Sequence, residues 1–389
     1  MSFRIESCAR RLLEHGFWAY YWGETSRDML LKRRVRLINL YTNADLLQIS
    51  KLFPDVFFRQ GCDEQAFLTR GETQIRFFVS DFPMDRAVHI PGLLDVERSA
   101  AAHAASRCLF SIHAIYYDCR RKVFCDHVNA YPDLKGGLIR TVQPPERAAE
   151  IYPSIALKTA KVLSETGFQI DSTLRSFLDS SPTLHDYETP DCSVVWDFLG
   201  ILLSKWVYEA LILLDELDIL GQLLPELSLL KQVDQDKDHH PEGNGFWHTL
   251  ECVKCVKKPN RTLMMAILLH DTGKAVTLAE REKHKPFPNH SSESGRIARG
   301  VLQRFGFPIK EIEEIEFLVR NHMILNAIDR LPEKRCRDLF ISPFFPNLLE
   351  LYRADLQSGY HSTERYYHAA RVYREFLRRE RMWKHGVYA

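Results

Sequence analysis

The chain has 389 residues, which is enough for two or three domains with hydrophobic cores of their own. Its apolar share of 45% and charged share of 26% are ordinary for a soluble globular protein. A formal net charge of +1 excludes a uniformly basic surface, so any contact with RNA must come from local patches. The nine cysteines form no regular framework, which favours reduced thiols and a cytoplasmic location.

Charged residues interrupt the segments that would otherwise suit targeting or membrane insertion. Arg4 and Arg10 break the apolar core that a secretory signal peptide needs. The most apolar longer segment, residues 194–224, contains Asp197, Lys205 and further acidic side chains, and therefore indicates packed helices. We expect a cytoplasmic protein without a membrane partner.

Up to about residue 140, segments with helical spacing alternate with segments typical of strands. Expected helices cover residues 5–13, 26–32 and 44–52, and expected strands cover residues 17–22, 35–41, 66–70 and 73–79. The last two strands flank Gly71 and Glu72, as the arms of a hairpin do. Residues 107–117 and 122–127 supply further helix and strand, so this part is predicted to be an α/β or α+β head.

After Pro144 and Pro145 the pattern changes to helical spacing, and no convincing strand follows. Expected helices cover residues 148–166, 194–214, 210–230, 247–256, 263–270, 291–305, 309–322, 347–357 and 364–383. Residues 234–244 are polar and charged and indicate a connector. The sequence therefore predicts an α+β protein whose strands lie in the first part of the chain.

A His-Asp pair, His270 and Asp271, follows the apolar helical run 263–269 and is the most informative feature of the chain. Gly273 is expected to end that helix and to let a substrate approach, and Lys274 offers a positive charge to a phosphate. Further candidate metal ligands are His248, His290, His322 and Asp355. Imidazoles and carboxylates in this order suit one divalent cation, Mn²⁺, Fe²⁺, Ni²⁺ or Mg²⁺, or two cations bridged by Asp271.

Several candidates have a second interpretation. His290 and His322 either bind a second cation or contact phosphate, and another acid could replace Asp355 as the last ligand. Cys252 and Cys255 form a CxxC pair, but no second pair follows at zinc-site spacing, so a structural zinc site is not predicted. A basic cluster either contacts RNA phosphates or is a solvated surface; it consists of Lys32, Arg33, Arg34 and Arg36.

Motifs spread over most of the chain resemble one family. A glycine turn and a VRD-type helix are similar to residues 16–23 and to the segment with Arg27 and Asp28. Residues 42–44 fit the next part of the same motif, and no insertion or deletion is needed in between. Residues 116–118 and 214–227 continue the similarity. The chain thus resembles the bacterial tRNA nucleotidyltransferase and poly(A) polymerase (CCA-adding) family with a C-terminal HD domain. The resemblance implies a nucleotidyltransferase-like α/β head (1–143), an all-α neck (144–233) and an all-α HD domain (234–389).

The head departs from this family at its catalytic positions. The family places two carboxylates as Asp-x-Asp to hold two Mg²⁺ ions, and the aligned residues here are Leu37, Ile38 and Asn39. Residues 74–80 contain no third acid, and Glu24 replaces the second glycine of the turn. Leucine cannot bind a cation and a neutral amide is a poor ligand, so we expect a catalytically inactive head.

The predicted HD ligands, by contrast, all match what the resemblance implies. The main expected function is therefore a metal-dependent phosphohydrolase or phosphodiesterase that acts on nucleotides or RNA ends, tRNA among them, with Asp271 and Lys274 as catalytic residues. One alternative is an active nucleotidyltransferase that uses other acids, such as Asp28 or Asp45. Another is a non-catalytic RNA-binding protein.

Overall fold

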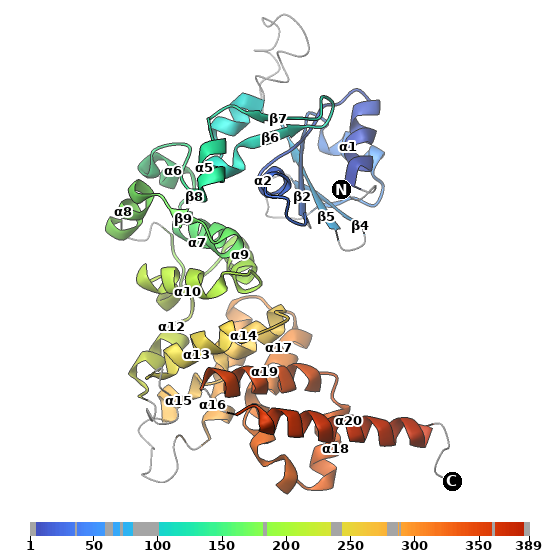
Figure 1. Ribbon diagram of the computed structural model, residues 1–389, viewed down its shortest axis with the longest axis vertical. Helices are drawn as coiled ribbons and strands as arrows, with labels where there is room; N and C mark the ends of the chain where they lie inside the picture. Colours follow the sequence, from blue (N-terminus) through green and yellow to red (C-terminus); the bar gives the residue numbers. More distant parts are fainter. Residues whose placement is uncertain are drawn as a thin grey trace, which may run out of the picture. The chain divides into compact units, whose positions relative to one another are not determined.

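The computed structural model describes residues 5–35, 37–58, 65–70, 73–80, 101–181, 185–234, 243–277, 287, 289–359 and 362–384. The chain divides into two compact units (Figure 1), one made of residues 1–155 and 167–184 and the other of residues 156–166 and 185–389. The division into segments 1–143, 144–233 and 234–389 stays a prediction.

The first unit is built on a seven-stranded sheet with the strand order β3-β4-β5-β2-β1-β6-β7. β2 and β5 run parallel, whereas the other neighbouring strands pair antiparallel. The strands are β1 (Ala19–Tyr21), β2 (Leu37–Thr42), β3 (Phe57–Phe58), β4 (Gln65–Arg70), β5 (Thr73–Val79), β6 (Ile115–Asp118) and β7 (Val123–Asp126).

Successive side chains of β2 point to opposite faces of this sheet, and a hydrophobic core packs on each face. Ile38 and Leu40 pack against Leu12 in one core, and Tyr41 joins Trp18 in the other. The helices of this unit are α1 (Ile5–Glu14), α2 (Glu24–Leu30), α3 (Leu46–Leu52), α5 (Tyr131–Gly136), α6 (Pro145–Ile151) and α8 (Ser172–Ser180), with the 3-10 helix η2 (Ser111–His113).

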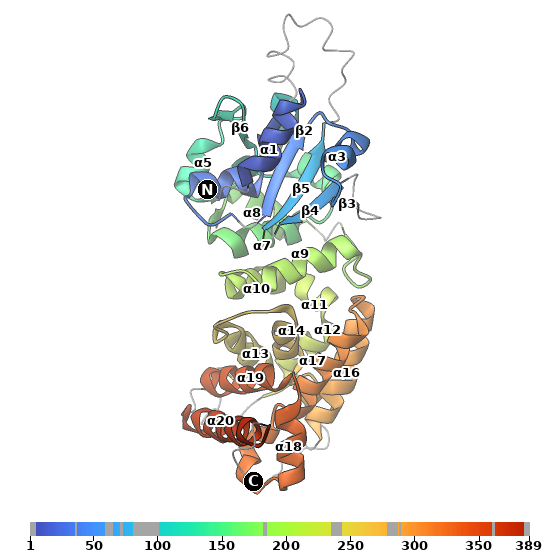
Figure 2. The same cartoon turned by 90° about the vertical axis from the view of Figure 1, so that its right-hand side faces the viewer.

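The second unit is helical, and α13, α16, α17 and α19 pack against α14 (Arg261–Leu269), which lies among them in Figure 2. Residues 262–269 are buried on all sides of that helix, as a continuous apolar run requires. No helix of the described residues is long and apolar enough to cross a membrane. The remaining helices are α7 (Ile155–Thr166), α9 (Cys192–Leu202), α10 (Val207–Glu216), α11 (Ile219–Leu223), α12 (Pro225–Ser228), α13 (Gly245–Lys254), α15 (Gly273–Val276), α16 (His290–Arg304), α17 (Ile309–Asn321), α18 (Glu333–Ile341), α19 (Phe345–Ser358) and α20 (Glu364–Lys384), with η3 (Leu229–Gln232) and η5 (Ile324–Arg330).

The predicted α+β class is confirmed, with local corrections. The helices expected over 194–214 and 210–230 are divided into α9, α10, α11, α12 and η3. The helix expected over 148–166 is two helices, because Pro153 cannot donate the backbone hydrogen bond that a continuous helix needs. β9 (Gln169–Ile170) pairs in parallel with β8 (Leu138–Ile139), so the segment after Pro144 is not entirely helical. A strand of two residues is too short to produce an alternating pattern that sequence analysis can detect.

Candidate metal centre

The structure brings the predicted ligands of the second unit together, although they come from different helices. α13 carries His248, α19 carries Asp355, and α16 begins at His290. His270 and Asp271 follow the last residue of α14, and His322 follows the last residue of α17. Four of the six side chains are almost completely inaccessible to solvent, namely His248, His270, Asp271 and His322.

Asp271 lies at the centre of this cluster, and its two carboxylate oxygens face two different groups of histidines. Oδ2 lies 3.3 Å from Nε2 of His270 and 3.9 Å from Nε2 of His248. Oδ1 lies 3.7 Å from Nε2 of His290 and 3.6 Å from Nε2 of His322. A carboxylate placed in this way can bridge two cations.

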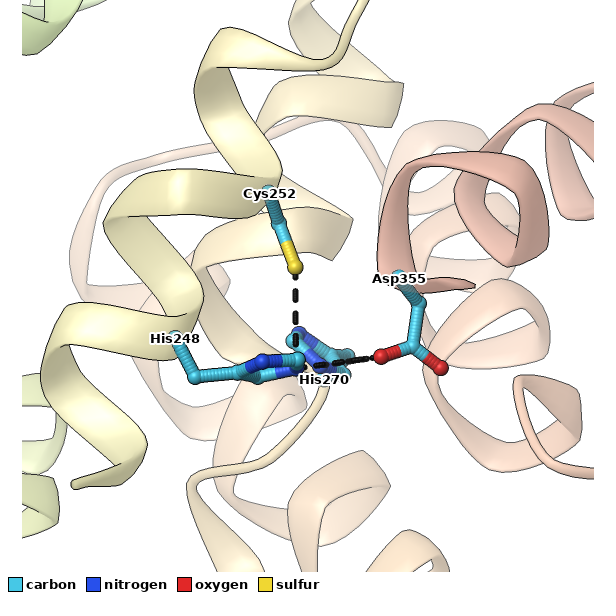
Figure 3. A group of neighbouring side chains, drawn as sticks. All are labelled: His248, Cys252, His270 and Asp355. Carbon is cyan, nitrogen blue, oxygen red and sulfur yellow. Dashed lines mark hydrogen bonds and ion pairs between the residues drawn. The ribbon is translucent and has the colours of Figure 1, made fainter. Parts of the chain in front are cut away.

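Two sets of donor atoms, each gathered within 4.8 Å, are close enough to hold a metal ion. The first set, drawn in Figure 3, consists of His248, Cys252, His270 and Asp355. The second set consists of Asp271, His290 and His322. Cys252 was not among the predicted ligands. Its position four residues after His248 was the available signal, because residues four apart share one face of a helix.

Backbone hydrogen bonds hold three of the imidazole rings in the orientation that a metal ligand needs. Each ring uses Nδ1 to donate to the carbonyl three residues earlier: His270 to Ile267 at 2.7 Å, His290 to Phe287 at 2.9 Å, and His322 to Val319 at 2.7 Å. Nε2 of each ring is thereby left to face the cluster. Nε2 of His270 is buried without a hydrogen-bond partner among the described residues. A bound cation would satisfy the lone pair of this nitrogen.

The charges in the cluster favour an ionised Asp271 and neutral His290 and His322, whereas His270 attracts positive charge. Burial opposes ionisation of Asp271, but His270 and Lys274 outweigh it and hold its pKa well below the usual range. Burial alone would lower the pKa of His270, but the neighbouring carboxylate of Asp271 outweighs burial and raises that pKa to about 9. A positive charge, from a proton or a cation, is therefore favoured at the imidazole of His270. Burial lowers the pKa of His322 to about 4 and also lowers the pKa of His290. Neutral imidazoles beside an ionised carboxylate are what a cation requires.

Asp355 contacts the same cluster from α19. Its Oδ1 lies 3.0 Å from Nε2 of His248 and 4.0 Å from Nε2 of His270. Burial would raise the pKa of Asp355, but the hydrogen bond with His248 outweighs burial and lowers it. A positive charge, whether a proton or a cation, is therefore stabilised between these side chains.

A cavity of about 660 Å³ opens beside the cluster, which is within the size range of small-molecule sites. Nζ of Lys274 lies 2.7 Å from Oδ2 of Asp271, so this lysine is positioned at the cluster itself. The lining of the cavity includes Asp271, Lys274, Asn326, Asp355 and Arg365. Two cationic side chains and the candidate metal ligands thus share one cavity, an arrangement suited to a phosphorylated ligand.

Gly273 does not have the role that the sequence suggested. α14 ends at Leu269, and Gly273 is the first residue of α15. A Cβ atom at this position would lie 2.2 Å from the carbonyl oxygen of His290 and 2.6 Å from the backbone nitrogen of Ser294. The glycine is therefore required for close packing of α15 on α16, which sets the position of His290.

In the first unit, the positions aligned with the family's Asp-x-Asp pair hold Leu37 and Asn39. Asn39 lies opposite Arg76 in the register between β2 and β5. The side-chain amide of Asn39 donates a hydrogen bond to the carboxylate of Glu24. Among the described residues, neither of the groups able to hold a metal ion lies in this unit. The absence of an acid at Asn39 is visible in the sequence. The position of Arg76 opposite Asn39 is not, because β2 and β5 are paired by a long-range contact.

The two acids proposed as replacements have local structural contacts. Asp28 pairs with Nε of Arg27 at 2.9 Å. Asp45 caps α3 and accepts a hydrogen bond from the backbone nitrogen of Gln48 at 2.7 Å. Neither observation supports a metal site at these residues.

The predicted basic cluster lies between α2 and β2. Lys32, Arg33 and Arg34 are exposed, whereas Arg36 lies outside the described residues. An RNA contact at this cluster stays a prediction.

The chain is similar to proteins of known family. The HD domain family matches residues 248–342, which include every predicted ligand except Asp355. A CC-adding tRNA nucleotidyltransferase from Thermus thermophilus is 35% identical over 169 residues, or 40% of this chain and 36% of the relative. A multifunctional CCA protein from Neisseria gonorrhoeae is 28% identical over 225 residues, or 57% of this chain and 53% of the relative. The chain thus spans about a third to a half of the length of these curated relatives.

Solved structures share the fold of this chain. A Bacillus stearothermophilus CCA-adding enzyme in complex with CTP superposes with a TM-score of 0.58 at 17% identity, covering 96% of this chain and 80% of that chain. A tRNA nucleotidyltransferase complexed with a primer tRNA and an incoming ATP analog has a TM-score of 0.56 at 17% identity, covering 96% of this chain and 99% of that chain. The chain therefore contains an HD domain, is similar over part of its length to CCA-adding tRNA nucleotidyltransferases and shares the fold of CCA-adding enzymes.

Proposed function

We propose that this protein is a metal-dependent phosphohydrolase or phosphodiesterase that acts on nucleotides or RNA ends through the cluster around Asp271. The observation that carries the proposal is the placement of the two Asp271 oxygens, each of which faces a separate pair of histidines. Buried imidazoles with Nε2 turned inward and an ionised carboxylate between them are suited to binding cations and have no other evident use.

The donor atoms fit one or two divalent cations such as Mn²⁺, Fe²⁺, Ni²⁺ or Mg²⁺. His248, His270 and Asp355 would hold one ion and His290 and His322 the other, with Asp271 between them. Such an ion would polarise a phosphoryl oxygen and lower the pKa of water toward neutrality.

The chain's own residues would bind and orient the phosphoryl group. Lys274 lies at the entrance to the cluster, where its ammonium group can donate to a phosphoryl oxygen. Arg365 lines the same cavity and can bind a second oxygen or a neighbouring phosphate. The backbone bonds to Nδ1 of His270, His290 and His322 keep these rings from turning during turnover.

Activity of the purified full chain toward a panel of phosphomonoesters and phosphodiesters tests this proposal. The panel should contain nucleotides, cyclic phosphates and tRNA with phosphorylated ends. We expect hydrolysis that is lost on treatment with a chelator and regained on addition of a divalent cation. Hydrolysis that is indifferent to the chelator would overturn the proposal.

Replacing Lys274 with alanine should weaken turnover of phosphorylated substrates while the metal content is retained. Losing a charge-assisted hydrogen bond costs about 1.5–3 kcal/mol, which is on the order of ten- to a hundred-fold in rate if the bond forms in the transition state. Steady-state kinetics and metal analysis measure both effects. Lys310→Ala, at an exposed position of α17, is the matched control and should behave like the parent protein.

Nucleotide addition to tRNA is the second candidate, and the similarity to named nucleotidyltransferases favours it over hydrolysis with an inactive head. Leu37, Asn39 and Arg76 in the first unit argue against it, because a guanidinium beside an amide repels the cations that this chemistry needs.

Incubation with CTP or ATP, Mg²⁺ and tRNA that lacks its 3′-terminal nucleotides distinguishes the two candidates. We expect no extension by this chain under conditions in which an active CCA-adding enzyme extends the same tRNA. Introducing Asp at both Leu37 and Asn39 should leave hydrolysis unchanged, because the proposed hydrolytic site belongs to the other unit. Robust metal-dependent incorporation by the parent protein would instead establish the second candidate.

A further inference from the structure

Cys252 is a soft donor within the candidate metal centre, where the predicted ligands are imidazoles and carboxylates. It lies one helical turn after His248 on α13, and both side chains point to the same face. Its Sγ lies 3.6 Å from Nε2 of His248, and the residue is only 1% exposed. The thiol therefore faces the cluster without access to bulk solvent (Figure 3).

A second observation points to a ligand at this thiol. Nε2 of His270 belongs to the same set of donor atoms and is buried without a hydrogen-bond partner among the described residues. Asp355 faces the set from α19, with Oδ1 3.0 Å from Nε2 of His248. Two imidazole nitrogens, one sulfur and one carboxylate oxygen thus lie within 4.8 Å of one another, a mixture of nitrogen, sulfur and oxygen donors that zinc accepts and to which Asp271 would add a fifth donor.

We propose that Cys252 binds, as a thiolate, the cation held by His248, His270 and Asp355, and that this half of the centre therefore takes Zn²⁺ in preference to Mg²⁺. The inference rests on the proposed function, because it specifies one metal of that site. When the ion binds, the S–H bond breaks, the sulfur donates its electron pair to the metal and the proton leaves to solvent.

Distances and donor chemistry both support zinc. Zinc bonds of about 2.3 Å to sulfur and 2.0–2.1 Å to nitrogen place these two atoms about 3.6 Å apart when the bonds meet at a tetrahedral angle. The separation between Sγ of Cys252 and Nε2 of His248 is 3.6 Å. Mg²⁺ prefers six oxygen ligands in near-ideal octahedral geometry and keeps several waters, which a buried sulfur and two imidazoles cannot provide.

The competing explanation is that Cys252 only packs in the helix interface. Its Sγ lies 3.0 Å from Oγ of Ser358 and can donate a weak hydrogen bond there. That hydroxyl in turn donates to the backbone carbonyl of Asp355 at 2.7 Å. Under this explanation, metal binding would be independent of the sulfur.

Cobalt substitution distinguishes the two explanations. The purified full chain is stripped with a chelator and titrated with Co²⁺, and the near-ultraviolet thiolate-to-cobalt absorption is compared with the visible bands of the ion. We expect the thiolate absorption in the parent protein and in Cys255→Ser, whose side chain lies outside the set. Cys252→Ser and Cys252→Ala should lose this absorption but keep visible bands from cobalt held by the remaining ligands.

Zinc affinity, measured by competition with a chromophoric chelator, gives an independent readout. Removing the outer partners of a metal ligand costs 10–100-fold in affinity, so losing a ligand itself should cost about a hundredfold or more for Zn²⁺ in Cys252→Ser. Mg²⁺ affinity should be unchanged. Thermal unfolding shows whether each variant is folded. If Cys252→Ser does not fold, zinc affinity is measured on Cys252→Ala instead.

The outcomes separate this inference from the proposed function. Cobalt binding without thiolate absorption, or zinc affinity equal in Cys252→Ser and the parent protein, would overturn the inference and leave the proposed function intact. Absence of any metal binding in the folded parent protein would overturn both.

Discussion

Replacing Asp271 with alanine should abolish hydrolysis and reduce the bound metal. The two oxygens of this carboxylate face both groups of histidines, so the substitution removes a ligand from each half of the centre at once. It also leaves Lys274 without the carboxylate that lies 2.7 Å from its Nζ. Stabilisation by a metal ion is worth several kcal/mol in the transition state, so we expect a loss on the order of a thousandfold or more in rate.

Metal content and kcat measured on the same preparation check this expectation. Asp338→Ala, at an exposed acid of α18, is the control for loss of a carboxylate and should change neither quantity. Asp271→Asn keeps the side-chain volume and should also fail, since an amide cannot replace the bridging charge. Hydrolysis that survives both Asp271→Ala and a chelator would defeat the proposed function.

Replacing Gly273 with alanine should destabilise the second unit and disturb the half of the centre that contains His290. The new Cβ would meet the backbone of His290 at 2.2 Å and that of Ser294 at 2.6 Å, and backbone atoms cannot rotate away as a side chain can. Overpacking of this kind costs about 1–3 kcal/mol and forces α15 and α16 apart. His290 would move with α16, so activity should fall even where the protein remains folded.

Gly300→Ala supplies a control on α16, the helix against which Gly273 packs. A Cβ at Gly300 meets no atom within 4 Å, so this substitution should stabilise α16 by roughly 0.5–1 kcal/mol through helix propensity alone. Thermal unfolding of both variants should therefore shift in opposite directions. Equal unfolding temperatures, with full metal content in Gly273→Ala, would contradict the packing role assigned to this glycine.

Local sequence patterns predicted most of the longer elements, although not every break between helices, and they nominated most of the candidate ligands. Continuous apolar residues predict the buried α14, and a short, largely apolar run predicts β2, because each pattern depends only on neighbours along the chain. The gapless match from Arg27 to Ala44 placed Leu37 and Asn39 at the acid positions of the family. The adjacent His270 and Asp271, the order of the other histidines and the resemblance to HD domains nominated His248, His270 and Asp271, because imidazoles and carboxylates bind divalent cations.

Only the tertiary structure decided how these residues are used. His248 and Asp355 are 107 positions apart, and nothing in the sequence specifies that α13 and α19 pack side by side. The same packing turns Cys252 toward the cluster and brings Gly273 against the backbone of α16. The positions of the ligands, the contact between Gly273 and α16 and the strand register all depend on packing between distant segments. Residue spacing along the chain does not specify such packing.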